Sequence, residues 1–328
     1  MAFNGSAYGH LGNIPQRDPA LHEAPKEMWF VENGRHYDTF RRGKYMFPCD
    51  EEEMDRMDIF HKFFTVARHY DSPFGGLYQR PLPNRPRIMD LGCGTGIWAI
   101  DMADQLNQPV HILGWDLSLI QPRQIPPGVV FERRDIEDPW TGVEENSYDL
   151  VHIRMLAGCI SHWPSLYGQV FRTLNPGTGI LEHVEIDFRP YYEDGRVPRG
   201  SKLLQWAEEL HEAMTRAGRP MGMDSSTVGL LQSIGYVDVE QITTRVPFNP
   251  WPADEHEKEI GRWFNLGLCQ GLHALTLAPL TRMNGYNKEQ VDALVNEVRK
   301  EICSRNMRVY CTLYVWTARR PPLPGQRA

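Results

Sequence analysis

The sequence predicts an α/β fold in which a mostly parallel β-sheet lies between layers of helices. From Arg87 onward, short apolar runs typical of strands alternate with helical runs or long loops. A glycine-rich turn, GCGTG at 92–96, stands between one such apolar run and a helical run. Acidic residues follow successive predicted strands. In such a sheet, a ligand site is expected at the carboxyl ends of the strands.

The elements follow one another regularly along the chain. The predicted strands are RIMDL (87–91), PVHILGWDLS (109–118), VVFERRDI (129–136), YDLVHIRML (148–156), GILEHVEIDF (179–188), VDVEQITTRVPF (237–248) and RVYCTLYVWTAR (308–319). Helical periodicity predicts helices at 97–107, 163–175, 202–218, 254–275 and 287–303. This alternation favours a sheet with helices on both faces.

A further helix is predicted before the first of these strands, from Glu51. Asp50 is placed to cap it, and Glu53 three residues later completes a capping-box pattern. Acidic residues in the first turn suit the positive end of the helix dipole. One apolar face is formed by Met54, Met57, Phe60, Phe64 and Ala67. We expect this face to pack on a core.

These elements divide the chain into four segments. Residues 1–28 and 321–328 are rich in Gly, Pro and polar residues and are predicted to be flexible tails. Residues 29–85 are predicted to form an N-terminal helical cover, with the Pro- and Gly-rich stretch at 72–87 as its linker. Residues 86–320 are predicted to form one α/β domain with helical insertions.

Composition narrows the classes of partner. The chain has 328 residues, with 42 acidic against 35 basic side chains and a formal net charge of -7. This balance, without a long Lys/Arg run, argues against direct nucleic-acid binding. The six cysteines show no zinc-ligand spacing, and no segment has the length and apolarity of a membrane span. We therefore expect an intracellular protein with no metal site and no membrane contact.

The glycine-rich turn points to a nucleotide-like ligand. A phosphate-binding P-loop would need Lys and Ser or Thr after its last glycine, and Gly96 is followed by Ile97. A dinucleotide fingerprint reads G-x-G-x-x-G, whereas Gly92, Gly94 and Gly96 are evenly spaced. Asp90, just before the turn, would repel a pyrophosphate and attract a cation. S-adenosylmethionine (SAM), which carries a sulfonium and an ammonium group, fits that charge.

Two further acids support this interpretation. Asp116 ends the next predicted strand, about 20 residues after the glycines, where a carboxylate typically binds ribose hydroxyls. Asp135 ends the strand after that, at the place for a carboxylate that accepts from an adenine amino group. The order of glycine turn, Asp116 and Asp135 on successive strands predicts a SAM site.

At the level of families, MDLGCGTGIWAI resembles the hallmark motif of class I SAM-dependent methyltransferases. ENGRHYDTFRRGKYMFPCDEEEMDRMDIFHKFFTVAR, HVEIDF and NPWPADEHEKEIGRWFNL resemble a narrower group, the fungal LaeA-like methyltransferases that associate with velvet-domain regulators. The resemblance spans about Glu32 to Leu266. It implies a seven-stranded Rossmann-like sheet whose last strand is antiparallel. It also implies a velvet-domain (VeA-like) partner, and a role in the nucleus and cytoplasm in the transcriptional control of secondary metabolism and development.

Candidate site residues follow from these patterns. The residues expected to bind SAM, and to release its product S-adenosylhomocysteine, are Asp90, Gly92, Cys93, Gly94, Gly96, Asp116, Leu117, Asp135, Ile136, Arg154, Tyr37 and Arg42. Tyr37 and Arg42 belong to a segment that either closes over the cofactor or simply packs on the core. The catalytic group is not identified, and its candidates are His152, His162, His183 and Glu185. Each histidine can equally be a buried, hydrogen-bonded structural residue.

The methyl acceptor stays open at this point. A base is needed only if the acceptor must lose a proton, so the lack of an evident triad does not exclude an enzyme. Met155, directly after the fourth strand, is itself a candidate acceptor because its thioether is nucleophilic. A protein acceptor within a velvet complex, a small-molecule acceptor of secondary metabolism, and a SAM-binding scaffold with little turnover are the three hypotheses.

Overall fold

A computed structural model describes residues 28–325. Residues 1–27 and 326–328, which hold most of the predicted N-terminal tail and the end of the predicted C-terminal tail, lie outside the described residues. Residues 321–325 form neither helix nor strand. No helix of the described part is long and apolar enough to cross a bilayer.

The core of the fold is a seven-stranded sheet with the order β5-β4-β3-β6-β7-β9-β8. Its strands are β3 (Arg87–Leu91), β4 (His111–Asp116), β5 (Val129–Arg133), β6 (Leu150–Arg154), β7 (Ile180–Tyr192), β8 (Val237–Pro247) and β9 (Val309–Arg319). β3 to β7 pair in parallel, and β9 is antiparallel to both β7 and β8. The predicted fold class and the antiparallel last strand are confirmed.

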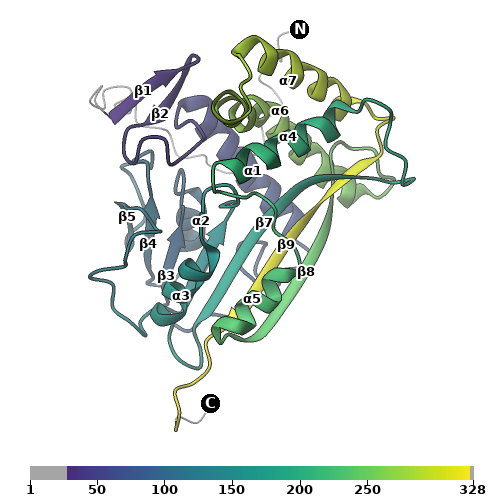
Figure 1. Cartoon of the computed structure of the whole chain (residues 1–328). Coiled ribbons are helices and arrows are strands. Elements are labelled where there is room, and N and C mark those ends of the chain that lie inside the picture. Colours follow the sequence, from purple (N-terminus) through teal and green to yellow (C-terminus); the bar gives the residue numbers. More distant parts are fainter. Residues whose placement is uncertain (1–27, 326–328) are drawn as a thin grey trace.

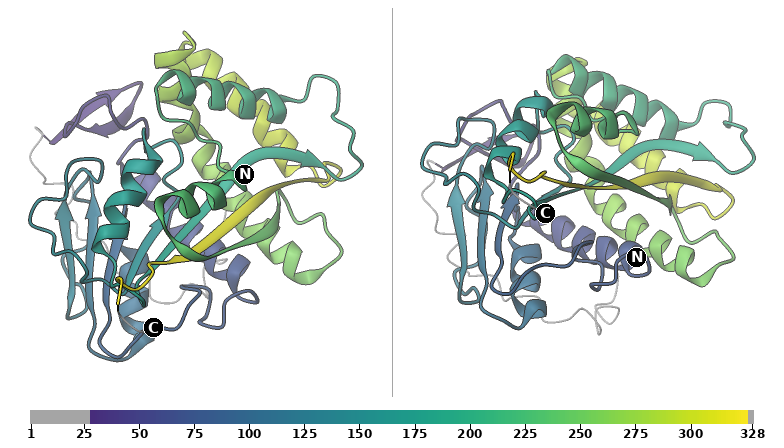
Figure 2. Two further views of the ribbon diagram at one scale, coloured as in Figure 1. Left: turned by 60° about the horizontal axis from the view of Figure 1, so that its bottom comes forward. Right: turned by 90° about the horizontal axis from the view of Figure 1, so that it is seen from below.

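Helices cover both faces of the sheet and one end of it (Figure 2). They are α1 (Glu51–Arg68), α2 (Ile97–Leu106), α3 (Trp163–Thr173), α4 (Lys202–Arg216), α5 (Ser226–Ile234), α6 (Glu255–Met283) and α7 (Lys288–Cys303). Alternate side chains of β3 divide the core, because Ile88 packs toward α2 and Met89 toward α3. α4, α6 and α7 lie together beside the part of β7 and β9 that extends beyond the shorter parallel strands (Figure 1).

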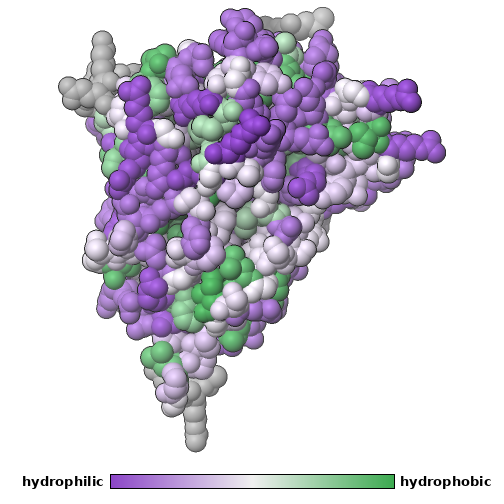
Figure 3. Space-filling model, viewed as in Figure 1, coloured by the Kyte–Doolittle hydropathy of each residue, from purple (hydrophilic) through white to green (hydrophobic). Residues whose placement is uncertain are grey.

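The surface is polar over most of one face of the molecule. The face shown in Figure 3 is largely hydrophilic, and apolar residues gather in its lower half, over the region of α3 and α5. Val228, Leu230 and Ile234 of α5 are only partly buried against the core beneath them. Partial exposure of a few apolar side chains is ordinary for a folded domain.

The segment before α1 begins as a β-hairpin, so the predicted helical cover of residues 29–85 contains two strands besides its helix. β1 (Trp29–Glu32) pairs with β2 (Arg35–Asp38) in an antiparallel ladder. The turn is Asn33-Gly34, and both residues have positive φ, 52° and 85°. This is the turn that a two-residue hairpin prefers, because its twist matches that of the strands.

α1 begins where the sequence predicted. The Asp50 carboxylate accepts from the Glu53 amide at 3.2 Å, which confirms the cap. The reciprocal half of the capping box is absent, because the Glu53 carboxylate instead accepts from Arg56, at 2.6 Å and 2.9 Å. Apolar residues of α1 pack on Phe264 of α6, whose ring lies 6.0 Å from that of Phe60. Phe60, Phe64 and Ala67 of the predicted apolar face thus lie in the core that α1 shares with α6, whereas Met54 and Met57 pack in a separate cluster with Cys49 and Ile120.

A buried ion pair attaches the end of α1 to the centre of the sheet. Arg68 donates to Glu182 of β7 at 2.8 Å, and both side chains are 1% exposed. A second guanidinium nitrogen of Arg68 donates to the Leu77 carbonyl at 3.3 Å. Since α1 also lines the pocket described next, this pair fixes the helix in position above the strand ends.

Candidate functional site

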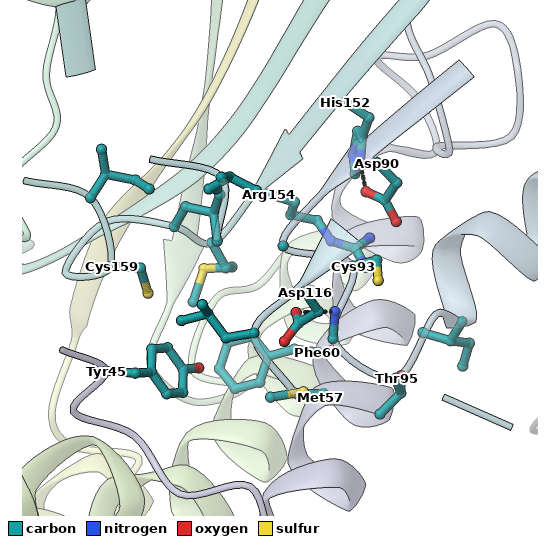
Figure 4. A pocket seen from close by; sticks show the side chains of 18 of the residues that line it. Tyr45, Met57, Phe60, Asp90, Cys93, Thr95, Asp116, His152, Arg154 and Cys159 are labelled. Atoms are coloured by element: carbon teal, nitrogen blue, oxygen red, sulfur yellow. Dashed lines mark hydrogen bonds and ion pairs between the residues drawn. The ribbon is translucent and has the colours of Figure 1, made fainter. Parts of the chain in front are cut away.

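One pocket opens at the carboxyl ends of β3, β4 and β6 and is covered by α1 and by the segment between β2 and α1 (Figure 4). The strand side contributes Asp90, Asp116 and Arg154. The cover contributes Lys44, Tyr45, Arg56, Met57, Phe60, His61 and Phe64. The strand ends therefore contribute charged side chains to the pocket, and the cover contributes a mixture of aromatic, apolar and basic ones.

The glycine turn leaves space that no other residue would leave. Gly92 and Gly96 have φ values of 69° and 78°, a left-handed conformation that L side chains rarely adopt. A Cβ at Gly92 would approach Leu156 to 2.4 Å, and one at Gly96 would approach Phe131 to 2.4 Å. The two glycines thus let Leu156 and Phe131 pack directly against the turn, and Gly92, Gly94, Thr95 and Ile97 line the pocket at the start of α2.

Asp116 ends β4, as predicted, and is tied to the glycine turn. One carboxylate oxygen accepts from the Gly94 amide at 2.8 Å, and the other accepts from the Ser118 amide at 2.9 Å. Burial raises the pKa of Asp116 to about 6, although these two bonds favour the ionised form. A ligand that donates hydroxyl groups to this carboxylate would stabilise its ionised form.

Asp90 lies deeper, at the end of β3, and pairs with His152 of β6 at 2.9 Å. The imidazole of His152 stacks on Trp98, with ring centroids 3.7 Å apart. Burial raises the pKa of Asp90 to about 7 and lowers that of His152 well below its ordinary value. The second oxygen of Asp90 has no hydrogen-bond partner, so this carboxylate has spare capacity for a cationic donor. His152 is packed and paired, which makes it a poor candidate for a general base.

Arg154 is held by a residue that the sequence did not single out. Its guanidinium lies 3.2 Å from Nδ1 of His61 on α1, and Nε2 of His61 lies 2.8 Å from Asp101 on α2. Burial lowers the pKa of Arg154 to about 10 and also lowers the pKa of His61. The neutral imidazole can therefore accept from Arg154 and donate to Asp101, which orients the guanidinium. Arg154 is placed to meet an anionic ligand group.

Asp135 lines the pocket two residues after β5 ends, but its carboxylate is already engaged. It forms ion pairs with Lys44 and, at 3.4 Å, with Arg41. Lys44 also pairs with Glu137 at 3.1 Å. Although burial opposes it, hydrogen bonds from Ser161 and Lys44 lower the pKa of Glu137 to about 2. These ion pairs hold the segment between β2 and α1 against the end of β5, so that it covers the pocket.

The remaining predicted cofactor residues divide into two groups. Cys93, Leu117 and Ile136 line the pocket with the glycines. Tyr37 and Arg42 do not reach it. Tyr37 is buried under Arg282 of α6, whose guanidinium lies 4.9 Å from its ring, and Arg42 lies 4.3 Å above Phe30 of the hairpin. The hairpin turns these side chains away, and Lys44 and Tyr45 line the pocket instead.

Three of the four catalytic candidates lie outside the pocket lining. His162 caps α3 and bonds to Ser165 at 2.7 Å. His183 is buried and bonds to the Tyr167 hydroxyl at 2.8 Å. Glu185 accepts from the Leu156 and Ala157 amides at 2.9 Å each, so it shapes the loop after β6. Only His152 lines the pocket, and it is engaged as described above.

Met155 does line the pocket, in an unusual backbone conformation. Its φ is 57°, and its amide donates to the Val184 carbonyl of β7 at 3.1 Å. Near it lie Tyr45, Phe60, Phe64, Leu156, Cys159 and Ile160. Burial raises the pKa of the Tyr45 phenol well above its ordinary value. Among the described residues, no group of His, Cys, Asp and Glu could hold a metal ion.

Trp251, Trp263 and Phe264 are three large aromatic residues at the start of α6 and just before it. Phe264 is fully buried between α1 and β8, which makes it a core residue. Trp263 packs on the same core, and the Trp251 indole donates to the Val309 carbonyl at 3.1 Å. None of the three lines the pocket. The long insertion acts on the pocket indirectly, by supporting α1.

Comparison with known proteins identifies a methyltransferase domain in this chain. A family model described as a methyltransferase domain matches residues 66–241. Among solved structures, Haemonchus contortus phosphoethanolamine N-methyltransferase 2, crystallised with S-adenosyl-L-methionine, gives a TM-score of 0.47 at 17% identity, covering 81% of this chain and 57% of that one. The fold assignment rests on the strand order and on the domain match.

Relatives of known name cover nearly the whole chain. The secondary metabolism regulator LAE1 of Cochliobolus heterostrophus is 50% identical over 299 residues, which are 89% of this chain and 95% of that protein. The secondary metabolism regulator laeA of Fusarium oxysporum is 41% identical over 295 residues, 89% and 92% of the two chains. That of Aspergillus flavus is 40% identical over 298 residues, 90% and 79% of the two chains. The chain is a methyltransferase and belongs to the LaeA/LAE1 family of secondary metabolism regulators.

Proposed function

We propose that the protein binds S-adenosyl-L-methionine in the pocket and transfers its methyl group. The observation that carries the proposal is the arrangement of Asp90 and Asp116 on either side of the glycine turn. In this assignment Asp116 binds the ribose hydroxyls and Asp90 faces the positive charge of the donor. Arg154 meets the donor carboxylate, and Asp135 and Ile136 lie at the adenine end.

The reaction is an in-line displacement at the methyl carbon. The acceptor's lone pair forms the new bond, the bond from methyl to sulfur breaks, and the sulfonium becomes the neutral thioether of S-adenosylhomocysteine. The protein mainly has to hold donor and acceptor at attack distance and exclude water. His61 and His152, the two histidines of the pocket lining, are both engaged in hydrogen bonds. This favours an acceptor that need not lose a proton.

We propose further that the acceptor is a protein side chain, with Met155 of the chain itself as one candidate. Its thioether has a free lone pair, lies in the lining, and would become a sulfonium on methylation. In the same proposal the protein acts with a velvet-domain partner, in the nucleus and the cytoplasm. The family membership supports this regulatory role. A small-molecule acceptor and a scaffold with little turnover are the alternatives that the following test separates.

The test is to titrate SAM and S-adenosylhomocysteine into the purified protein by calorimetry and then to follow transfer from SAM labelled at the methyl group. We expect binding of both compounds, and label on protein, mapped by mass spectrometry as a gain of one CH₂. Label on the Met155 peptide, and its loss in Met155→Leu, would identify self-methylation. Both steps are repeated with a velvet-domain protein present. Absence of binding under both conditions would overturn the proposal. Binding without label on protein would exclude the protein acceptor, and transfer to added small-molecule acceptors would then separate a small-molecule methyltransferase from a scaffold.

SAM affinity is expected to fall at acidic pH. Burial raises the pKa of Asp90 to about 7 and that of Asp116 to about 6 in the free protein. A cationic ligand favours the ionised carboxylates, so below these values binding must release protons. As the pH falls below these pKa values, the dissociation constant for SAM should rise by about tenfold per pH unit for each proton released. Calorimetric titrations of SAM at a series of pH values around these two pKa values measure this dependence.

The control for this pH effect is a pair of matched substitutions. Asp90→Asn should weaken binding and flatten the part of the profile near pH 7. Asp104→Asn, on the exposed side of α2 and outside the pocket, should keep the wild-type profile. An unchanged profile in Asp90→Asn would show that another group is responsible.

A further inference from the structure

Two cysteine thiols lie in contact at the surface, where α6 packs against α7. Cys269, in the middle of α6, and Cys303, the last residue of α7, have their sulfur atoms 3.5 Å apart. Cys303 is exposed and Cys269 is partly buried, so the pair is open to solvent from one side. The sulfurs are in van der Waals contact, and a disulfide between them would bring them to a bonded distance of about 2 Å.

The surroundings hold the two thiols in this position. The Asn265 side-chain oxygen accepts from both sulfurs at 3.9 Å. Its amide nitrogen donates to the Phe248 and Ile302 carbonyls, at 2.8 Å and 2.9 Å. Asn265 thereby ties α6 to the last turn of α7. Arg299 donates to the Cys269 carbonyl at 2.9 Å, which brings a positive charge close to the pair.

The remaining cysteines differ in environment. Cys49, Cys93 and Cys311 are buried, and Cys159 lies in the pocket lining. Burial also raises the pKa of Cys269 to about 12, although Arg299 opposes this rise. The exposed Cys303 is therefore the thiol that an oxidant in solution meets first, with Cys269 directly behind it as the resolving thiol.

We propose that Cys269 and Cys303 form a reversible intramolecular disulfide whose formation depends on the ratio of oxidised to reduced glutathione around the protein. With glutathione disulfide as oxidant, the Cys303 thiolate attacks one sulfur, forms a mixed disulfide and releases one glutathione. The Cys269 thiolate then attacks the Cys303 sulfur and releases the second glutathione. Two protein thiols lose two electrons and two protons, and one glutathione disulfide becomes two molecules of glutathione.

The position of the pair gives the bond a structural consequence. On α6, Gly267 lies against Phe60 and Ile59 of α1, and Gly271 lies against Arg56. A Cβ at Gly271 would approach the Arg56 side chain to 2.4 Å, so α6 and α1 are closely fitted. A covalent link from α7 to Cys269 restrains α6 between these two contacts. Oxidation therefore stiffens the helix that supports the cover of the pocket.

The experiment exposes the folded protein to glutathione buffers of graded redox potential, blocks free thiols and maps peptides by mass spectrometry. Wild type should give one cross-linked peptide pair joining Cys269 and Cys303, two hydrogens lighter than the reduced pair. Its unfolding temperature should rise on oxidation and return when reductant is added. This readout does not depend on SAM binding, so it is separable from the test of the proposed function.

Two variants separate the steps. Cys269→Ser should stop at the first step and keep glutathione on Cys303, whereas Cys303→Ser should take up no glutathione at position 269. In neither variant should the unfolding temperature rise on oxidation. Because Cys303 is exposed, Cys303→Ser should fold as wild type does. The proposal fails if wild type stays reduced in the most oxidising buffer, if the link joins other cysteines, or if it joins two chains.

Discussion

Asp116→Ala is expected to weaken SAM binding by at least about a hundredfold. A carboxylate that accepts from two ribose hydroxyls makes two charge-assisted hydrogen bonds, each contributing about 1.5–3 kcal/mol. The loss of about 3 kcal/mol corresponds to roughly two powers of ten in the dissociation constant. The substitution also removes the acceptor of the Gly94 amide, which loosens the glycine turn on which the ligand rests. Calorimetric titration of SAM and S-adenosylhomocysteine measures the effect.

The matched control is Asp104→Ala, which removes an exposed carboxylate outside the pocket and should leave both affinities unchanged. Thermal unfolding of each variant without ligand shows whether the fold is intact. If folded Asp116→Ala binds SAM as wild type does, Asp116 does not bind the ribose, and the assignment of the donor's orientation is wrong.

Arg68→Met is expected to lower the free energy of unfolding by about 3–5 kcal/mol, since it leaves the Glu182 carboxylate buried without its charged partner. The loss should also affect the pocket, because Arg68 joins α1 to β7. We therefore expect SAM binding to weaken in parallel with stability. Urea unfolding, followed by circular dichroism, measures the change.

A second substitution tests whether the unpaired charge is the cause. In Arg68→Met/Glu182→Leu no charge is left, and much of the lost stability should return. Glu212→Gln breaks the exposed pair between Arg216 and Glu212 on α4, and should change stability by less than about 1 kcal/mol. A double variant as unstable as Arg68→Met would mean that the position requires the arginine's shape rather than its charge.

The sequence was sufficient to predict most of the framework. Strand and helix periods differ, so the alternation after Arg87 predicted the sheet and its helices. The cap at Asp50 was predictable because the capping residue and its helix are adjacent in sequence. The hairpin β1–β2 was missed although Asn33-Gly34, a two-residue turn signal, lies between its strands. The short, polar β2 lacks the apolar alternation that would have drawn attention to it.

The strand side of the pocket was predictable because its acidic residues lie at the ends of predicted strands. Asp90 is the penultimate residue of β3 and Asp116 is the last residue of β4, and parallel strands bring their carboxyl ends to one edge. The cover was not predictable in this way. His61 meets Arg154, 93 residues away, only because α1 packs across the strand ends. Tyr37 and Arg42 were misplaced because the direction of a hairpin is set by tertiary packing, which no local pattern records.

The position of β9 has a consequence for alleles of this gene. The strand is encoded after every other element of the sheet, yet in space it joins β7 to β8. A nascent chain therefore holds two unpaired strand edges until codons 309–319 have been translated. A nonsense mutation between codons 160 and 309 would spare every residue that lines the pocket and still delete the strand that closes the sheet. Such alleles should behave as complete losses of function, whereas in-frame changes in exposed loops should be tolerated.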